Sequence, residues 1–183
     1  RLYMTAPVMK KRFFNFLDEN IKKGKPFEVD WVMGSCMMLK RQLFNETGAF
    51  DEAFFLYEEE TELEFRIKRS GLQNYMHPGA KVLHNHHSSA GKLGVIFVTY
   101  QEFRSRIIFD SKRFRGYKYF LRRLLIVFAL FLRVMYFLPK FFFSFGYGIT
   151  YRANYDLLIF ALKSRTNILN DRFKKKKKKY LFL

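Results

Sequence analysis

The chain has 183 residues, enough for one domain with a hydrophobic core, and its formal net charge at pH 7 is +18. A single cysteine, Cys36, excludes an intramolecular disulfide framework and predicts a reducing compartment. The sequence begins with Arg1 in a stretch typical of folded proteins, so we expect a fragment of a longer protein.

The positive charge is concentrated in the second half of the chain. Residues 1–92 hold 14 Lys and Arg against 12 Asp and Glu, a net charge of +2. Residues 93–183 hold 20 against 4, a net charge of +16, and are rich in Phe, Tyr and Leu. A basic, aromatic composition is typical of proteins that bind anionic membranes or nucleic acid, whereas the balanced first half is typical of a soluble α/β domain.

Three elements are predicted at the start of the chain. Residues 1–27 form a helix or a loop that ends near Gly24. The mostly apolar run over 29–39 favours a buried strand. Residues 41–48 favour a short helix that is stopped by Gly48.

A further helix is predicted over residues 60–70. Leu63 and Ile67 lie one turn apart on its apolar face, and Gly71 is a typical residue after a helix end. Residues 72–84 contain two short apolar segments around a Pro-Gly turn. These segments predict a hairpin or two edge strands.

The basic half predicts amphipathic helices. Residues 94–114 show a helical apolar stripe. Within residues 119–151 the longest uncharged run before Pro139 is nine residues, Leu124–Leu132, which is shorter than the roughly 20 apolar residues of a membrane-spanning helix. A helix in the membrane interface is therefore favoured, with Arg122, Arg123 and Arg133 near its polar edge. A buried helix and a spanning helix remain alternatives.

The lysine run Lys174–Lys179 predicts a disordered tail. Such a tail either binds anionic lipid headgroups or keeps the chain soluble.

Five glutamates lie between Glu58 and Glu64, directly after an aromatic run. Acidic residues stabilise a helix N-terminus by about 0.3–1 kcal/mol each, so this stretch alone indicates an ordinary helix start. The order of the surrounding residues favours a chemical role. A run containing Gly34 and Ser35 leads to a helix that ends in Gly-Ala-Phe-Asp-Glu, and Phe-Phe-Leu-Tyr and the glutamates follow.

This order resembles the C-terminal half of the catalytic domain of family 2 glycosyltransferases of the GT-A fold, in particular bacterial rhamnosyltransferase-like enzymes of surface polysaccharide synthesis. The resemblance covers residues 28–92. The matching positions are Gly48, Phe50, Asp51, Glu52, Phe54, Phe55, Leu56, Tyr57, Glu59, Glu60, Leu63, Arg66 and Gly71.

The resemblance implies roles for several of these residues. Glu60 is the general base that takes a proton from an acceptor hydroxyl, and Glu59 is the neighbour that shapes its electrostatics or contacts the acceptor. Gly34 and Ser35 allow close approach of the acceptor sugar, although sheet packing explains them equally well.

Two further residues are assigned to the acceptor side. Trp31 lines the acceptor site or belongs to the core. Asp51 is the aspartate of the family's Phe-Asp-Glu segment and is also counted among the acceptor-side residues.

The resemblance also implies a donor side. His84 binds the divalent ion of the donor diphosphate, Mg²⁺ or Mn²⁺, and Ser88 and Ser89 lie near the phosphates. The histidines lack the spacing and partner ligands of a zinc site. The family's Asp-x-Asp metal motif does not occur in this sequence, so the chain as given is expected to be catalytically incomplete.

The expected fold class is α/β: residues 1–92 form the C-terminal half of a GT-A domain, and residues 93–183 form basic amphipathic helices with a disordered tail. The expected function is inverting transfer from a nucleotide-sugar donor to a lipid-linked or polysaccharide acceptor. We expect peripheral binding to the anionic cytoplasmic face of the plasma (inner) membrane, and no nucleic acid. The alternatives are a non-catalytic basic module that binds membrane or nucleic acid, and an inactive membrane-bound scaffold.

Overall fold

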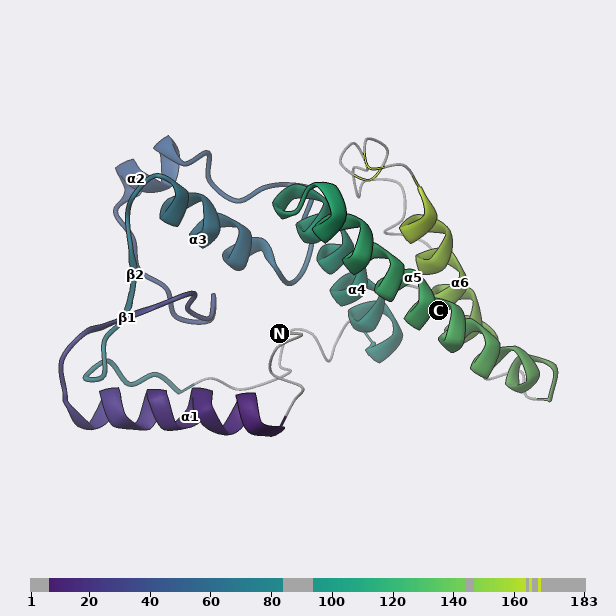
Figure 1. Cartoon of the computed structure of the whole chain (residues 1–183), viewed down its shortest axis with the longest axis horizontal. Helices are drawn as coiled ribbons and strands as arrows, with labels where there is room; N and C mark the ends of the chain where they lie inside the picture. The colour runs from purple at the N-terminus through teal and green to yellow at the C-terminus, as the bar shows by residue number, and fades with distance from the viewer. Residues whose placement is uncertain (1–6, 84–93, 144–146, 164, 166–167, 169–183) are drawn as a thin grey trace. The chain divides into compact units, whose positions relative to one another are not determined.

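The computed structural model describes residues 7–83, 94–143, 147–163, 165 and 168 (Figure 1). The chain forms two compact units, and each combines residues from distant parts of the sequence. Unit 1 contains residues 1–47 and 63–84, and unit 2 contains residues 48–62 and 85–183. Residues 48–62, with the glutamates Glu58 to Glu62, group with the basic half of the chain, and the boundary expected at residue 92 stays a prediction.

Unit 1 contains a two-stranded sheet. Strand β1 (Phe27–Val29) pairs antiparallel with strand β2 (Asn74–Met76), so that Phe27 lies opposite Met76. Helix α1 (Pro7–Lys22) precedes β1, and helix α2 (Arg41–Glu46) follows it. Helix α2 confirms the predicted short helix, and Gly48 beyond it has a φ of 85°, a left-handed conformation that glycine adopts without steric cost.

The strand predicted over residues 29–39 is wrong beyond Val29. The following apolar residues form a loop with a turn in which the Cys36 N–H donates to the Met33 carbonyl at 3.2 Å. Met33 and Met38 are exposed. An apolar run forms a buried strand only where neighbouring strands cover it, and β1 pairs only with β2 in the part of the chain that the structure describes.

Of the hairpin or two edge strands predicted within residues 72–84, one strand is formed among the described residues. This strand is β2, which pairs with β1 rather than with the residues after Pro78. Residues 80–83 lie in no strand. The second half of the expected pair is therefore absent from the described sheet.

Helix α3 (Glu59–Arg69) confirms the predicted helix over 60–70. Leu63 and Ile67 are both buried, as its apolar face required. Gly71 has a φ of 88° and donates to the Lys68 carbonyl, while the Leu72 N–H donates to the Ile67 carbonyl. This is the Schellman pattern that ends helices, so the local sequence alone determines where α3 stops.

Unit 2 is a helical bundle of α4 (Val95–Arg113), α5 (Gly116–Phe143) and α6 (Gly148–Leu162), which lie side by side in Figure 1. Helix α4 confirms the predicted helix over 94–114. The residues that form the core of the bundle include Phe97, Tyr100, Ile108, Leu130, Leu157 and Phe160. Phe54, from the aromatic run before the glutamates, belongs to the same core.

Helix α5 is a single helix of 28 residues, with Pro139 near its C-terminal end. It is the one candidate among the described residues that is long and apolar enough to cross a membrane, with a mean hydropathy of 2.0 over its best window. The short uncharged run near Leu124 therefore does not exclude a crossing. The described fold is mostly helical with a two-stranded sheet, and the GT-A assignment stays a prediction.

Candidate functional site

Glu60 lies in the first turn of α3 and is buried, with 8% of its surface exposed. Its Oε2 atom is shielded from solvent and has no hydrogen-bond partner among the described residues. Most buried carboxylates are paired or hydrogen-bonded, because an unsatisfied charged oxygen is costly to bury. Such an oxygen is free to accept a proton from a bound ligand, which is the geometry that a general base requires.

The backbone directly before α3 is strained. Tyr57 and Glu58 have φ values of 64° and 66°, in the left-handed region that non-glycine residues rarely occupy. Each such residue costs about 1–3 kcal/mol and persists only where surrounding contacts impose it. Two in succession, immediately before Glu59 and Glu60, indicate that the start of α3 is held in a defined conformation.

Three consecutive residues of α4 supply those contacts. Each of them donates to a different point of the segment that leads to α3. The bonds run from Arg104 to the Ala53 carbonyl at 2.9 Å, from Ser105 to the Leu56 carbonyl at 2.8 Å, and from Arg106 to Glu58 Oε1 at 3.0 Å. We call Arg104, Ser105 and Arg106 the α4 anchor.

The α4 anchor continues into a row of buried charges. Arg106 Nε lies 3.9 Å from Asp110 Oδ1, which accepts a hydrogen bond at 2.8 Å from Arg122 on α5. Burial raises the pKa of Asp110 above its ordinary value of 3.8, although Arg122 and Arg106 act in the opposite direction. The charges of the glutamate segment are thus linked through α4 to α5.

Asp51, predicted to contact the acceptor, also supports this segment. Its Oδ1 accepts the Ala53 N–H at 2.9 Å, and its Oδ2 forms an ion pair with Lys112 of α4. The first bond is an Asx turn, which shapes the backbone locally. Both oxygens therefore have protein partners, and the acceptor role of Asp51 stays a prediction.

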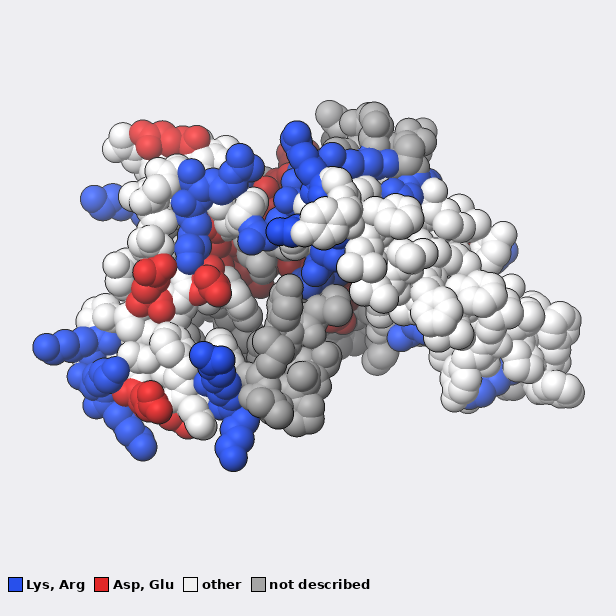
Figure 2. Space-filling view, viewed as in Figure 1, with Lys and Arg blue, Asp and Glu red and all other residues white. Residues whose placement is uncertain are grey.

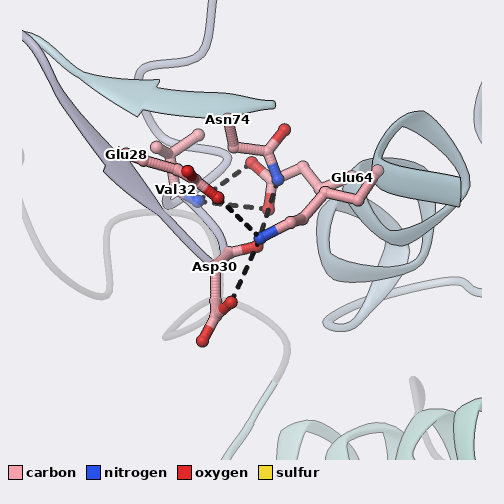
Figure 3. Close-up of polar contacts among 6 residues, drawn as sticks. Glu28, Asp30, Val32, Glu64 and Asn74 are labelled. Carbon is pink, nitrogen blue, oxygen red and sulfur yellow. Dashed lines mark hydrogen bonds and ion pairs between the residues drawn. The ribbon is translucent and has the colours of Figure 1, made fainter. Parts of the chain in front are cut away.

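Within unit 1, Glu64 is hydrogen-bonded to the loop after β1. Its two carboxylate oxygens accept the Val32 N–H at 3.0 and 3.1 Å, as Figure 3 shows, and the residue is 2% exposed. The Asn74 side chain donates to the Asp30 carbonyl at 3.0 Å in the same region. Glu64 therefore fixes the loop after β1 to α3.

The second ionic contact of unit 1 lies at the surface. Lys68 contacts the Asp30 carboxylate at 3.2 Å and the Glu28 carboxylate at 3.4 Å. The hydrogen bond to Asp30 raises the pKa of Lys68 above 10.5. Lys68 of α3 thus contacts residues at the end of β1.

The predicted acceptor residues Trp31, Gly34 and Ser35 belong to the loop after β1. Gly34 and Ser35 are exposed, and Trp31 is half-buried. Ser35 lines an open hollow of about 820 Å³ in unit 1, together with Glu64, His77 and several methionines. A volume of several hundred cubic ångströms is typical of small-molecule sites, so Ser35 lies where a ligand can reach it.

The predicted donor-side residues His84, Ser88 and Ser89 lie outside the described residues. Within the described ranges, no three His, Cys, Asp or Glu side chains gather at a distance suited to a metal ion. The described residues therefore do not themselves fit a divalent cation, and the ion at His84 stays a prediction.

Sequence reasoning identified the glutamates but missed the residues that hold them. The α4 anchor and Glu64 were not singled out. One feature of the sequence could have identified the α4 anchor. Arg104 to Arg106 are three consecutive polar residues inside a helix whose apolar stripe indicates burial on several sides. Polar residues inside a buried helix require partners, and here the partners lie 48 to 51 positions away along the chain.

Comparison with curated proteins gives three significant matches. Two are N-acetylglucosaminyl-diphospho-decaprenol L-rhamnosyltransferases of Mycobacterium tuberculosis, strains CDC 1551 / Oshkosh and ATCC 25618 / H37Rv. Each is 38% identical over 64 residues, which are 35% of this chain and 21% of the relative. The third is the low-salt glycan biosynthesis hexosyltransferase Agl10 of Haloferax volcanii, 29% identical over 86 residues, which are 47% of this chain and 28% of the relative.

Part of this chain is similar to glycosyltransferases. The match spans between about a fifth and somewhat more than a quarter of each relative's length. No protein-family profile and no solved structure matches the chain. The similarity supports a glycosyltransferase role, and the names of the relatives place their own reactions in the synthesis of lipid-linked or glycan products.

Proposed function

We propose that this chain is part of an inverting family 2 glycosyltransferase with a GT-A catalytic domain. The enzyme transfers a sugar, a hexose or a rhamnose, from a nucleotide-sugar donor to a lipid-linked or polysaccharide acceptor in cell-surface glycan synthesis. Partial similarity to a rhamnosyltransferase and to a hexosyltransferase supports the reaction class. The observation that carries the assignment to a residue is the buried Oε2 atom of Glu60, which has no hydrogen-bond partner among the described residues.

In this proposal Glu60 is the general base of a single displacement. The acceptor oxygen forms a bond to the anomeric carbon as the bond from that carbon to the diphosphate oxygen breaks. The acceptor hydroxyl proton passes to Glu60 Oε2, and the nucleoside diphosphate leaves with the bonding electrons. General-base catalysis by a positioned carboxylate contributes about 10²–10⁴-fold to such a rate.

The remaining residues position this carboxylate or the acceptor. Glu59 is the neighbouring carboxylate at the start of α3, and the α4 anchor holds the backbone that leads to it. Trp31, Gly34 and Ser35 are proposed for the acceptor side, and His84, Ser88 and Ser89 for the donor diphosphate. A divalent ion, when bound, would stabilise the departing diphosphate, and chelation with EDTA tests whether transfer requires it.

The test compares two glutamates of the same helix turn. Glu60→Gln and Glu62→Gln make the same isosteric change at residues that are 8% and 7% exposed. Transfer is measured with the longest natural protein that contains this chain, with labelled nucleotide sugars and an N-acetylglucosaminyl-diphospho-polyprenol acceptor. Glu60→Gln is expected to lower kcat at least about 100-fold with unchanged circular dichroism, and Glu62→Gln less than about tenfold.

Two results contradict parts of this proposal. Activity of Glu60→Gln within about tenfold of the parent shows that Glu60 is not the base. Absence of transfer by the parent protein with every nucleotide sugar, both to the lipid-linked acceptor and to polysaccharide acceptors, contradicts the reaction class itself.

A further inference from the structure

The outward side of α5 is apolar over most of its length. Five residues at intervals of four, each between 51% and 66% exposed, form what we call the α5 outer stripe: Phe120, Leu124, Phe128, Leu132 and Tyr136. Every exposed residue from position 119 to 139 is apolar. The surface over α5 is correspondingly mostly white in Figure 2. Contiguous exposed apolar surface of this kind marks an interaction site.

The charged residues of this stretch are turned toward the protein. Arg122 bonds to Asp110 of α4 at 2.8 Å, and Arg133 bonds to Asn154 of α6 at 2.8 Å. Arg123 bonds to the Tyr119 hydroxyl at 2.7 Å and to the Lys163 carbonyl. A surface helix that faces water shows the opposite pattern, with charges outside and apolar residues inside. Ionisable residues that face the protein interior, with partners there, are typical of helices in contact with lipid.

Cations and aromatic rings mark both ends of the stripe. Arg115 and Lys118 are exposed at the N-terminal end, beside the exposed Tyr117. At the other end the Lys140 ammonium lies 3.7 Å from the centre of the Tyr136 ring. Residues 119–139 extend about 30 Å at 1.5 Å per residue. Basic and aromatic side chains both favour the headgroup region of an anionic bilayer, so both ends of the stripe suit contact with it.

We propose that the α5 outer stripe binds an anionic lipid bilayer, with α5 lying in the plane of the membrane. The outward residues Tyr155 and Ile159 of α6 are also apolar. The in-plane orientation follows from the opposite side of α5, where α4 buries Arg104 and Asp110. A crossing α5 would carry these charges into the hydrocarbon, whereas an in-plane α5 keeps α4 on the water side.

The occupant is a membrane rather than a second copy of the chain, because the chain carries a net charge of +18. Like-charged copies repel, and anionic headgroups attract the cations at the stripe's ends by about 1 kcal/mol each. The proposal rests on unit 2 alone and does not depend on the proposed catalytic function. In-plane binding agrees with the peripheral membrane location that the sequence predicts.

Vesicle flotation tests the stripe. The full chain is mixed with vesicles of phosphatidylcholine alone, or of phosphatidylcholine with phosphatidylglycerol. The test variant Leu124→Glu places a charge on the stripe at a residue that is 53% exposed. The control variant Leu72→Glu makes the same change in unit 1 at a residue that is 45% exposed. We expect the parent to bind the anionic vesicles. Leu124→Glu should bind them at least about tenfold more weakly, and Leu72→Glu should bind within about twofold of the parent.

Depth measurements test the orientation. Tryptophan is introduced separately by Phe120→Trp, Phe128→Trp and Tyr136→Trp in a Trp31→Phe background, and lipids brominated at different acyl positions quench its fluorescence. Similar, shallow depths for all three variants are expected. Deep quenching for Phe128→Trp with shallow quenching at both ends shows a crossing helix and contradicts the in-plane orientation.

Three outcomes overturn the proposal that the stripe docks on an anionic membrane. The first is equal vesicle binding by the parent and Leu124→Glu. The second is equal binding to neutral and anionic vesicles. The third is a dimer of the parent that Leu124→Glu dissociates while vesicle binding is unchanged, which would identify the stripe as a subunit interface.

Discussion

The glutamate segment and helix α5 both turn charges away from water, but they use those charges differently. On α5, Arg122, Arg123 and Arg133 each find a partner on the protein, and the outward side is left apolar. In the glutamate segment, Glu58 and Glu64 are likewise bonded, yet Glu60 keeps one buried oxygen without a partner among the described residues.

The difference separates structural charges from a candidate reactive one. Buried charges that bond to a partner on another element hold elements together, and α5 is left with an apolar side that can contact a partner of its own. A buried oxygen without a partner costs free energy in the folded chain and is retained only where surrounding contacts or a ligand compensate for it. Partnered charge therefore indicates architecture in both regions. Asp110 Oδ2 and Arg122 Nε also lack a partner among the described residues, but these two side chains are bonded to each other through their other atoms.

Breaking the link between the two regions has the largest expected effect. Arg106→Ala leaves the buried Glu58 carboxylate without its cation and removes one cation near Asp110. Removing one partner of a buried ion pair costs about 3–5 kcal/mol, which urea unfolding measures. A Glu58→Gln/Arg106→Gln double variant is expected to lose less, because neither charge remains. Equal losses for both variants would show that the ion pair is not what holds the segment.

The two sides of α5 are expected to respond differently to the same substitution. Leu130→Ala, at a fully buried residue, should lower the free energy of unfolding by about 3 kcal/mol through lost contacts and a cavity. Leu124→Ala, at a residue that is 53% exposed, should change it by less than about 1 kcal/mol. Thermal unfolding in the absence of lipid measures both. Similar losses would mean that the outer side of α5 packs against the protein.

A satisfied glutamate should behave as a structural residue. Glu64→Ala removes the acceptor of the Val32 N–H and should lower the free energy of unfolding by about 2 kcal/mol, as measured by urea. Glu64→Gln keeps one acceptor oxygen and should lose less. A Glu64→Gln protein that folds normally but loses transfer as completely as Glu60→Gln would remove the distinction between the two glutamates.

The smallest expected effect is a pH dependence at Asp110. Its pKa is raised by burial, so the folded chain binds a proton more tightly than the unfolded chain. Its contribution to stability is therefore greatest below 3.8 and falls as the pH rises through the raised pKa. Urea midpoints of the parent and Asp110→Asn are compared from acidic pH upward, and the parent should lose stability relative to the variant. A difference that stays constant with pH contradicts the raised pKa.

Helices with local signals were predictable from sequence. Gly48 and Gly71 mark the ends of α2 and α3, and the apolar stripe of α4 gave its extent. Each of these signals lies within or beside the element that it defines. The sheet was not predictable in this way, because β2 pairs with a strand more than 40 residues earlier in the chain.

Only part of the candidate site, likewise, could be predicted from the sequence. Glu60 could be singled out because its neighbours form an ordered pattern in the sequence. The α4 anchor could not, since whether Arg104 or Ser105 points to solvent or to a distant carbonyl depends on packing between elements 49 to 51 positions apart. The outward apolar side of α5 could be expected from composition, but the inward direction of its arginines required the bundle.

The α4 anchor has a consequence for truncation. Consecutive residues of an α-helix project about 100° apart, so a segment bonded to three of them wraps part of the way around the helix. A protein cut after residue 92 would keep Glu60 and its whole sequence neighbourhood but would lose Arg104, Ser105 and Arg106. The left-handed conformations of Tyr57 and Glu58 would then be free to relax, and the shortened protein would retain the Glu60 carboxylate without the contacts that hold the backbone before it.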